Sequence, residues 1–113
     1  MHTTPKKVFA AVAERSPVCE RRKVLNDHEC GGRLTFEHVW KYAGRQVNEP
    51  WAIITLCEWA HSLGPYMGTG GLDKRINEYL SRRHLLDLTP DEFDATRLKY
   101  PRLFDNWPAI IQF

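Results

Sequence analysis

The side chains best suited to binding metal or moving protons are scarce in this chain of 113 residues, which has three cysteines and five histidines. Two histidines end short apolar segments: His38 follows Glu37 directly, and His61 comes four residues after Cys57. Thiolates and imidazoles are the preferred ligands of Zn²⁺. A histidine can also take a proton from water while a neighbouring carboxylate helps to hold a divalent cation. These placements indicate a metal site, a hydrolytic site, or both.

The three cysteines and one histidine form a candidate zinc site. Cys19 and Cys30 flank a segment with turn signals, and the i, i+4 spacing of Cys57 and His61 would put both on one face of a helical turn. Three thiolates and one imidazole suit a tetrahedral structural zinc. We predict these four ligands, with His28 as a spare candidate. The alternative is that the cysteines are small buried hydrophobes, since the ten residues between the first two exceed the usual spacing of a zinc knuckle.

Composition narrows the class of protein. The formal net charge is +2, from 16 basic and 14 acidic residues, which is a weak indication of nucleic acid binding. No apolar run approaches the roughly 20 residues of a membrane span. Residues 1–17 resemble an arm or short helix more than a signal peptide. We therefore expect a cytoplasmic protein without a membrane partner, in which cysteines stay reduced and serve metal binding or packing.

Apolar patterns predict the elements that position these side chains. Residues 33–39 alternate as in a strand, and residues 51–56 form a second short apolar run. The segment between Cys19 and Cys30 predicts a small hairpin or knuckle. Residues 57–63 predict one or two helical turns, which end at a Gly-Pro pair.

Two further helices are expected towards the C-terminus. Residues 72–86 carry an apolar stripe at helical spacing. Thr89, followed by Pro90 and then by Glu92, is a helix start with a capping box, and this helix should end before Pro101. We predict a small α+β fold with an N-terminal arm (1–17), a metal-binding domain (18–88), and a C-terminal helix with an apolar tail (89–113) that packs on the domain or meets a protein partner.

The order of these pieces resembles the HNH nuclease family, whose fold is the ββα-metal fold. The likeness is nearest to small phage or prophage proteins and covers residues 19–61. The pieces that carry it are the Cys19 and Cys30 pair, Phe36-Glu37-His38, Tyr42-Ala43-Gly44-Arg45, Asn48, and Leu56-Cys57 with His61. The resemblance implies a zinc-stabilised HNH-like domain, and the predicted C-terminal helices are additional elements that it does not cover.

The resemblance also implies residue roles. His38 would be the general base, and Glu37 and His61 would hold a catalytic cation such as Mg²⁺ or Mn²⁺, with Asn48 as a further catalytic residue or ligand. The cysteines would hold structural zinc. The first interpretation is thus a metal-dependent DNA endonuclease. The alternative is a catalytically inactive zinc-stabilised module that binds DNA or a protein, and a third is a structural adaptor that uses the apolar tail.

The chain departs from the family pattern at Ala60, where the family usually has its fourth zinc ligand. We expect His61 to be drawn into the zinc site, because a closed four-ligand site is the commoner structural arrangement. Otherwise His61 serves the catalytic metal, and the fourth zinc ligand is His28, water or absent.

Basic residues interleaved with aromatic ones supply candidate contacts to the DNA backbone, which are independent of sequence. The alternative is that these residues form solvated helix faces. The candidates are Arg45, Lys74, Arg75, Arg82 and Arg83.

Overall fold

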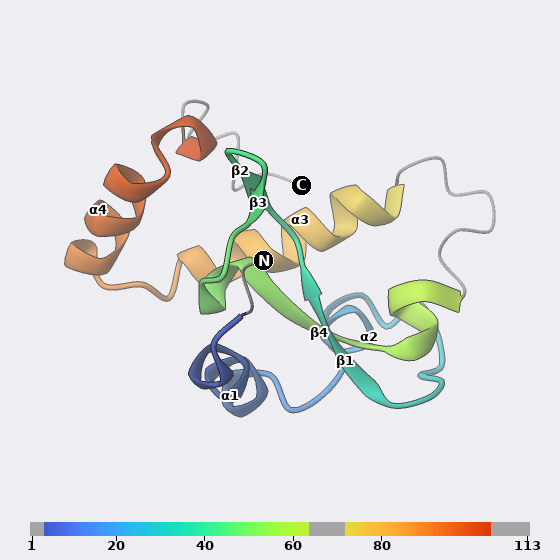
Figure 1. The fold of residues 1–113 in the computed structure, drawn as a ribbon. Coiled ribbons are helices and arrows are strands. Elements are labelled where there is room, and N and C mark those ends of the chain that lie inside the picture. Colours follow the sequence, from blue (N-terminus) through green and yellow to red (C-terminus); the bar gives the residue numbers. More distant parts are fainter. Residues whose placement is uncertain (1–3, 64–71, 105–113) are drawn as a thin grey trace.

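The computed structural model describes residues 4–63 and 72–104, and its centre is an antiparallel pair of strands. Strand β1 (Leu34–His38) pairs with β4 (Ile53–Cys57), in a register that sets Leu34 opposite Cys57 and His38 opposite Ile53. Between them the chain forms a second, smaller ladder of β2 (Lys41–Tyr42) and β3 (Arg45–Gln46). The predicted α+β class and both predicted extended segments are confirmed (Figure 1).

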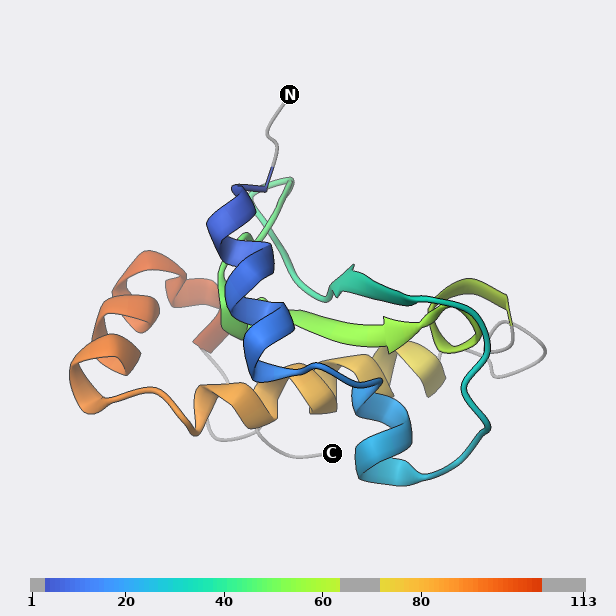
Figure 2. The ribbon, with the colours of Figure 1, turned by 90° about the horizontal axis from the view of Figure 1, so that it is seen from below.

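Both faces of β4 are covered, which explains its unbroken apolar sequence. All five of its residues are buried. Helix α1 (Lys6–Arg15) lies on one side of the strand pair and α3 (Leu72–Leu85) on the other (Figures 1 and 2). Successive side chains of a strand point to opposite faces. Ile53 accordingly packs against α1, and Ile54 and Leu56 pack with residues of α3; the helix residues in these contacts are Val8, Val12, Ile76 and Leu80.

The segment between Cys19 and Cys30, expected as a hairpin or knuckle, contains helix α2 (Glu20–Leu25). The helix ends at Asn26, which adopts a left-handed conformation with φ of 50°. A helix advances about 1.5 Å per residue, against about 3.3 Å in a strand. The helix therefore shortens the path between the two cysteines, and the wide spacing in sequence does not keep them apart.

The N-terminal segment, expected as an arm or a short helix, forms helix α1 and is part of the packed structure. Val12 is completely buried in the core that α1 shares with β4. Arg15, in the last turn of α1, donates hydrogen bonds to the backbone carbonyls of Pro50 and Ile53, both at 2.6 Å. These contacts fix α1 to the start of β4.

The predicted C-terminal helices are present. Helix α4 (Pro90–Lys99) begins with the predicted capping box, in which Thr89 Oγ1 accepts from the Glu92 N–H and Glu92 Oε1 accepts from the Thr89 N–H. Tyr100, just after α4, packs edge-on against Tyr42 and Trp51. None of the helices in the described residues is both long and apolar enough to span a membrane. The apolar tail expected to pack on the domain lies outside the described residues.

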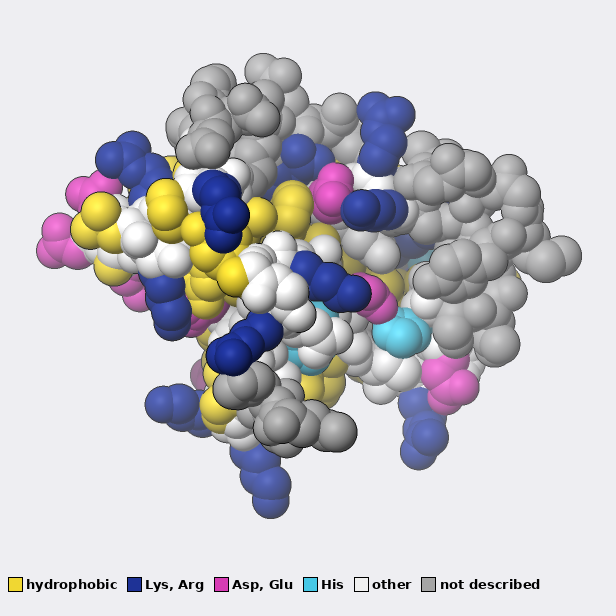
Figure 3. Space-filling model, turned by 45° about the horizontal axis from the view of Figure 1, so that its top comes forward, with side chains coloured by type: hydrophobic (Ala, Val, Ile, Leu, Met, Phe, Trp, Pro, Cys, Tyr) yellow, Lys and Arg dark blue, Asp and Glu magenta, His cyan; other side chains and the backbone are white. Residues whose placement is uncertain are grey.

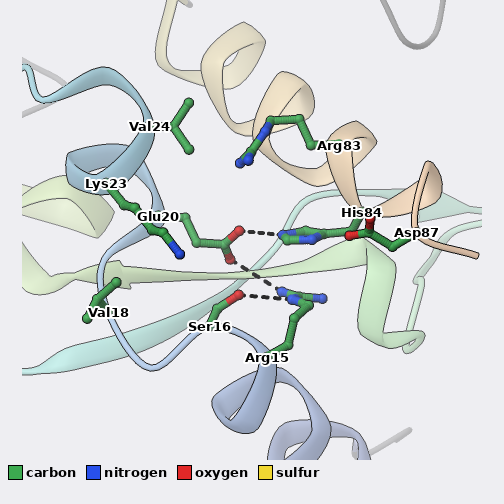
Figure 4. A pocket seen from close by; sticks show the side chains of 9 residues that line it. All are labelled: Arg15, Ser16, Val18, Glu20, Lys23, Val24, Arg83, His84 and Asp87. Atoms are coloured by element: carbon green, nitrogen blue, oxygen red, sulfur yellow. Dashed lines mark hydrogen bonds and ion pairs between the residues drawn. The ribbon is translucent and has the colours of Figure 1, made fainter.

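A buried carboxylate joins four elements of the fold. Glu20 of α2 accepts hydrogen bonds from the His84 ring of α3, from Arg15 of α1 at 3.3 Å and from the Thr55 N–H of β4 at 2.8 Å. Figure 4 shows this carboxylate between His84 and Arg15, beside a cavity of about 200 Å³. Burial alone would raise the pKa of Glu20, but the bonds from His84 and Thr55 and the charge of Arg15 outweigh it, so its pKa lies below the usual value.

We expect Glu20→Gln to lower the free energy of unfolding at neutral pH by about 3 kcal/mol, because it removes the negative charge from a buried ion network. The matched control is Glu29→Gln, whose side chain is 93% exposed beside Arg22 and should cost less than about 1 kcal/mol. Because the pKa of Glu20 is lowered on folding, its contribution is present above the unfolded pKa of about 4.3 and is lost as the pH falls through the lower folded value.

Urea unfolding of parent and variants at matched pH values measures both effects, and losses shared by all proteins cancel in the differences. The difference in free energy of unfolding between the parent and Glu20→Gln should be largest at neutral pH and should decrease in acid. Equal stability losses for the two variants would show that the Glu20 network is not stabilising.

Candidate functional site

Four side chains gather into a cluster that could hold a metal ion. The donor atoms of Cys19, His28, Cys30 and Cys57, hereafter the cysteine cluster, all lie within 4.8 Å of one another. His28 Nε2 is 3.4 Å from the sulfur of Cys57 and 3.8 Å from the sulfurs of Cys19 and Cys30. In a tetrahedral site with Zn–S bonds of about 2.3 Å, neighbouring ligand atoms lie about 3.5–3.8 Å apart. The cluster is therefore compatible with a structural zinc.

Backbone contacts hold the loop that carries His28 and Cys30 against the end of β4. The Trp59 N–H donates to the Gly31 carbonyl at 3.1 Å, and the Glu58 N–H donates to the Arg33 carbonyl at 2.9 Å. Gly32 has a φ of +79°, and a Cβ built on it would lie 2.8 Å from Glu58 Cβ. Glycine is therefore required at this position for the loop to close.

The surroundings of His28 orient it as a ligand. Its Nδ1 lies 2.8 Å from Asp27 Oδ1, its ring stacks on Trp59 at 4.7 Å, and its side chain is only 3% exposed. Arg21 Nε donates to Asp27 Oδ2 at 2.8 Å. Although partial burial raises the pKa of Asp27, the bonds from His28 and Arg21 bring it below the usual value. A carboxylate on the far nitrogen fixes the tautomer that presents Nε2 to a metal.

Asp27 and Arg21 were not predicted as residues of the metal site. The available signal was an acidic residue directly before a histidine that is close in sequence to a cysteine. That pattern indicates a metal site only when the fold places the three cysteine sulfurs on the opposite side of the His28 ring.

The thiols of the cluster differ in how readily they ionise. Burial opposes ionisation of Cys57, but hydrogen bonds from the backbone of Ala60 and Gly31 and from His28 lower its pKa to about 6. Desolvation and the neighbouring Cys57 and Cys19 raise the pKa of Cys30 to about 12. The first thiolate, at Cys57, therefore forms readily, whereas its negative charge opposes ionisation of the other thiols. A bound divalent cation would offset this repulsion between thiolates.

His61, predicted as the fourth zinc ligand, lies elsewhere, and His28 occupies that place. The helical spacing argument failed because Cys57 is still in β4, and the following turn η2 (Trp59–Leu63) is a π-helix rather than an α-helix. Ala60, at the position where the family usually has a ligand, is buried and its N–H points to Cys57 Sγ at 3.5 Å. The fourth side chain thus comes from the loop after α2.

His61 pairs instead with Glu37. Its Nε2 lies 2.7 Å from Glu37 Oε2, and both side chains are about one-third exposed. Two ligands of one cation at about 2.1 Å each lie about 3 Å apart, so a slight widening of this pair would admit a metal ion. Burial raises the pKa of Glu37 above its usual value, although the nearby His61 and His38 act in the opposite direction.

His38 makes a second close contact, with Asn48. Its Nε2 lies 3.1 Å from Asn48 Oδ1. Asn48 lies next to His38 because the segment that contains β2 and β3 folds back on itself. The Val47 N–H donates to the Trp40 carbonyl at 2.9 Å and closes this segment. Asn48 was also considered as a metal ligand, but its oxygen is directed at His38.

The five predicted DNA contacts lie on different parts of the surface. Arg45 is exposed on β3 and, with Asn48, lines a groove of about 440 Å³. Lys74, Arg75 and Arg83 are exposed on α3. Arg82 is half-buried and donates to the carbonyl of Glu78 in its own helix at 3.1 Å. Figure 3 shows lysine and arginine side chains spread over one face, with histidines at the surface between them.

Comparison of the chain with models of protein families, with curated proteins and with solved structures finds no match. Two groups of side chains in the described residues have the composition and spacing for metal binding or proton transfer. One is the cysteine cluster. The other is the paired set of Glu37 with His61 and His38 with Asn48, hereafter the catalytic set.

Proposed function

We propose that the protein is a metal-dependent endonuclease of the HNH type that hydrolyses phosphodiester bonds of DNA. The strongest support is that two adjacent residues at the end of β1 each contact another residue to which the HNH resemblance assigns a role. Glu37 is 2.7 Å from His61, and His38 is 3.1 Å from Asn48. Nothing in local chain geometry requires either contact, because the partners are 24 and 10 residues away in sequence.

Each member of the catalytic set has a role in this proposal. Glu37 and His61 would hold a divalent cation such as Mg²⁺ or Mn²⁺, which would supply positive charge to the scissile phosphate and to the leaving oxygen. His38 would take a proton from the water whose oxygen attacks phosphorus, as the bond to the leaving oxygen breaks. Asn48 would hold the His38 ring. Arg45 and the basic residues of α3 would contact the DNA backbone.

A structural zinc in the cysteine cluster would support this set from a distance. Zinc would tie the loop after α2 to the last residue of β4, directly before the turn that carries His61. A domain of this size has a small margin of stability. The apparent binding energy of structural zinc, roughly 10–16 kcal/mol in finger peptides, would therefore dominate the folding of this region.

The second candidate is a zinc-stabilised module of the same fold that binds DNA or a protein without catalysis. One observation favours it: His38 Nε2 is engaged by Thr4 at 2.8 Å as well as by Asn48. A histidine that only anchors the N-terminal segment to the sheet would make the same contacts.

Cleavage of supercoiled plasmid by the zinc-loaded protein distinguishes the two candidates. We expect cleavage that requires added Mg²⁺ or Mn²⁺ and that falls at least tenfold in Glu37→Gln at limiting metal, because the variant loses a charged ligand. Glu29→Gln, on an exposed loop, is the matched control. Absence of cleavage with every divalent metal tried would favour the binding module. Full activity in Glu37→Gln would show that Glu37 is not a ligand of the catalytic metal.

A further inference from the structure

We infer that Thr4, which lies outside the residues that carry the HNH resemblance, is a positioning residue that holds His38 in one tautomer. The inference concerns the same site as the proposed function and rests on it. Thr4 Oγ1 lies 2.8 Å from His38 Nε2 and 2.6 Å from Asn48 Oδ1. With the 3.1 Å contact between His38 and Asn48, the three side chains form a closed triangle.

With the Asn48 amide in this orientation, one placement of the hydrogens gives each of the three contacts a donor. Asn48 Oδ1 carries no hydrogen and can only accept. The Thr4 hydroxyl has a single hydrogen, which it donates to Asn48, so towards His38 its oxygen acts as the acceptor. His38 Nε2 must therefore carry a hydrogen and donate it. In the neutral ring, Nδ1 is then the nitrogen that can take a proton from water.

The fold holds Thr4 in this position through α1. The Val8 N–H bonds to the Pro5 carbonyl at 3.0 Å, and Val8 is buried against β4. Phe9 stacks on Phe36 with ring centroids 5.0 Å apart and meets the His38 ring edge-on at 5.9 Å. The start of α1 thus packs around His38, and the N-terminal segment reaches the catalytic set.

Two substitutions separate the hydroxyl from the shape of the side chain. Thr4→Val keeps the shape and removes the hydrogen bonds, whereas Thr4→Ser keeps the hydroxyl. Thr96→Val is the matched control, since the Thr96 hydroxyl donates to the Glu92 carbonyl within α4. We expect Thr4→Val to lower kcat about threefold to tenfold with KM little changed, and Thr4→Ser to retain most of the activity.

The tautomer provides a readout that does not need activity. In protein with ¹⁵N-labelled histidine, NMR should show His38 protonated at Nε2 in the parent and in Thr4→Ser. Thr4→Val loses the acceptor at 2.8 Å and keeps Asn48 Oδ1 at 3.1 Å, so the share of His38 protonated at Nδ1 should rise in this variant. A parent that cleaves no DNA but shows this pattern would reject the proposed function and keep the Thr4 inference. The inference is overturned if His38 is protonated at Nδ1 in the parent or if Thr4→Val leaves the tautomer unchanged. An equal or faster kcat in Thr4→Val would also overturn it, because the hydroxyl would then not assist His38.

Discussion

His28→Ala should release zinc at chelator concentrations that leave the parent protein loaded, and should lower the free energy of unfolding by roughly 3 kcal/mol or more. The estimate divides the apparent binding energy of a structural zinc among four ligands. The loss should be large because His28 is 3% exposed, faces three sulfurs and is held by Asp27 on its other nitrogen. Removing it leaves Asp27 without its histidine partner and the three thiols without their common neighbour.

The matched control is His61→Ala, which removes the same type of side chain from the other candidate ligand. The zinc content and stability of this variant should remain close to those of the parent, since His61 pairs with Glu37 away from the sulfurs. Metal analysis after dialysis against a chelator, with urea unfolding, measures both variants. Loss of zinc in His61→Ala and not in His28→Ala would reverse the assignment.

The parts of the fold that could be predicted from sequence are those with local signals. The alternation before His38 predicts β1, and the helical stripe after Leu72 predicts α3. The capping box at Thr89 predicts the start of α4 to the residue. These patterns arise from side-chain periodicity and from hydrogen bonds between residues three apart, so they do not depend on the rest of the structure.

The parts that could not be predicted depend on contacts between distant segments. The packing of α1 was not predicted, because nothing in its sequence shows that Arg15 reaches the carbonyls of Pro50 and Ile53. The choice of His61 as a zinc ligand assumed an α-helical turn, whereas the chain continues as a strand to Cys57 and then forms a π turn. His28 was only a spare candidate because its approach to Cys57 depends on α2 and the loop closed at Gly32.

His38→Ala should lower kcat for metal-dependent cleavage by about 10²–10⁴-fold, the usual effect of losing a general base. The fold and the zinc content should change little, because His38 is half-buried at the end of β1 and lies outside the cysteine cluster. Gln46→Ala is the matched control, since its side chain is exposed two residues before Asn48. Zinc analysis and urea unfolding of the same preparations show whether any loss of activity is a loss of structure.

The most direct test of the catalytic proposal is the ratio of nicking rates of parent and His38→Ala on supercoiled plasmid, with both proteins zinc-loaded and at saturating Mn²⁺. We expect the parent to nick the plasmid and the ratio to lie at about 10² or above, while both proteins unfold at similar urea concentrations. A ratio near one would show that His38 is not the base, and a parent that does not nick DNA would contradict the assignment of the catalytic set.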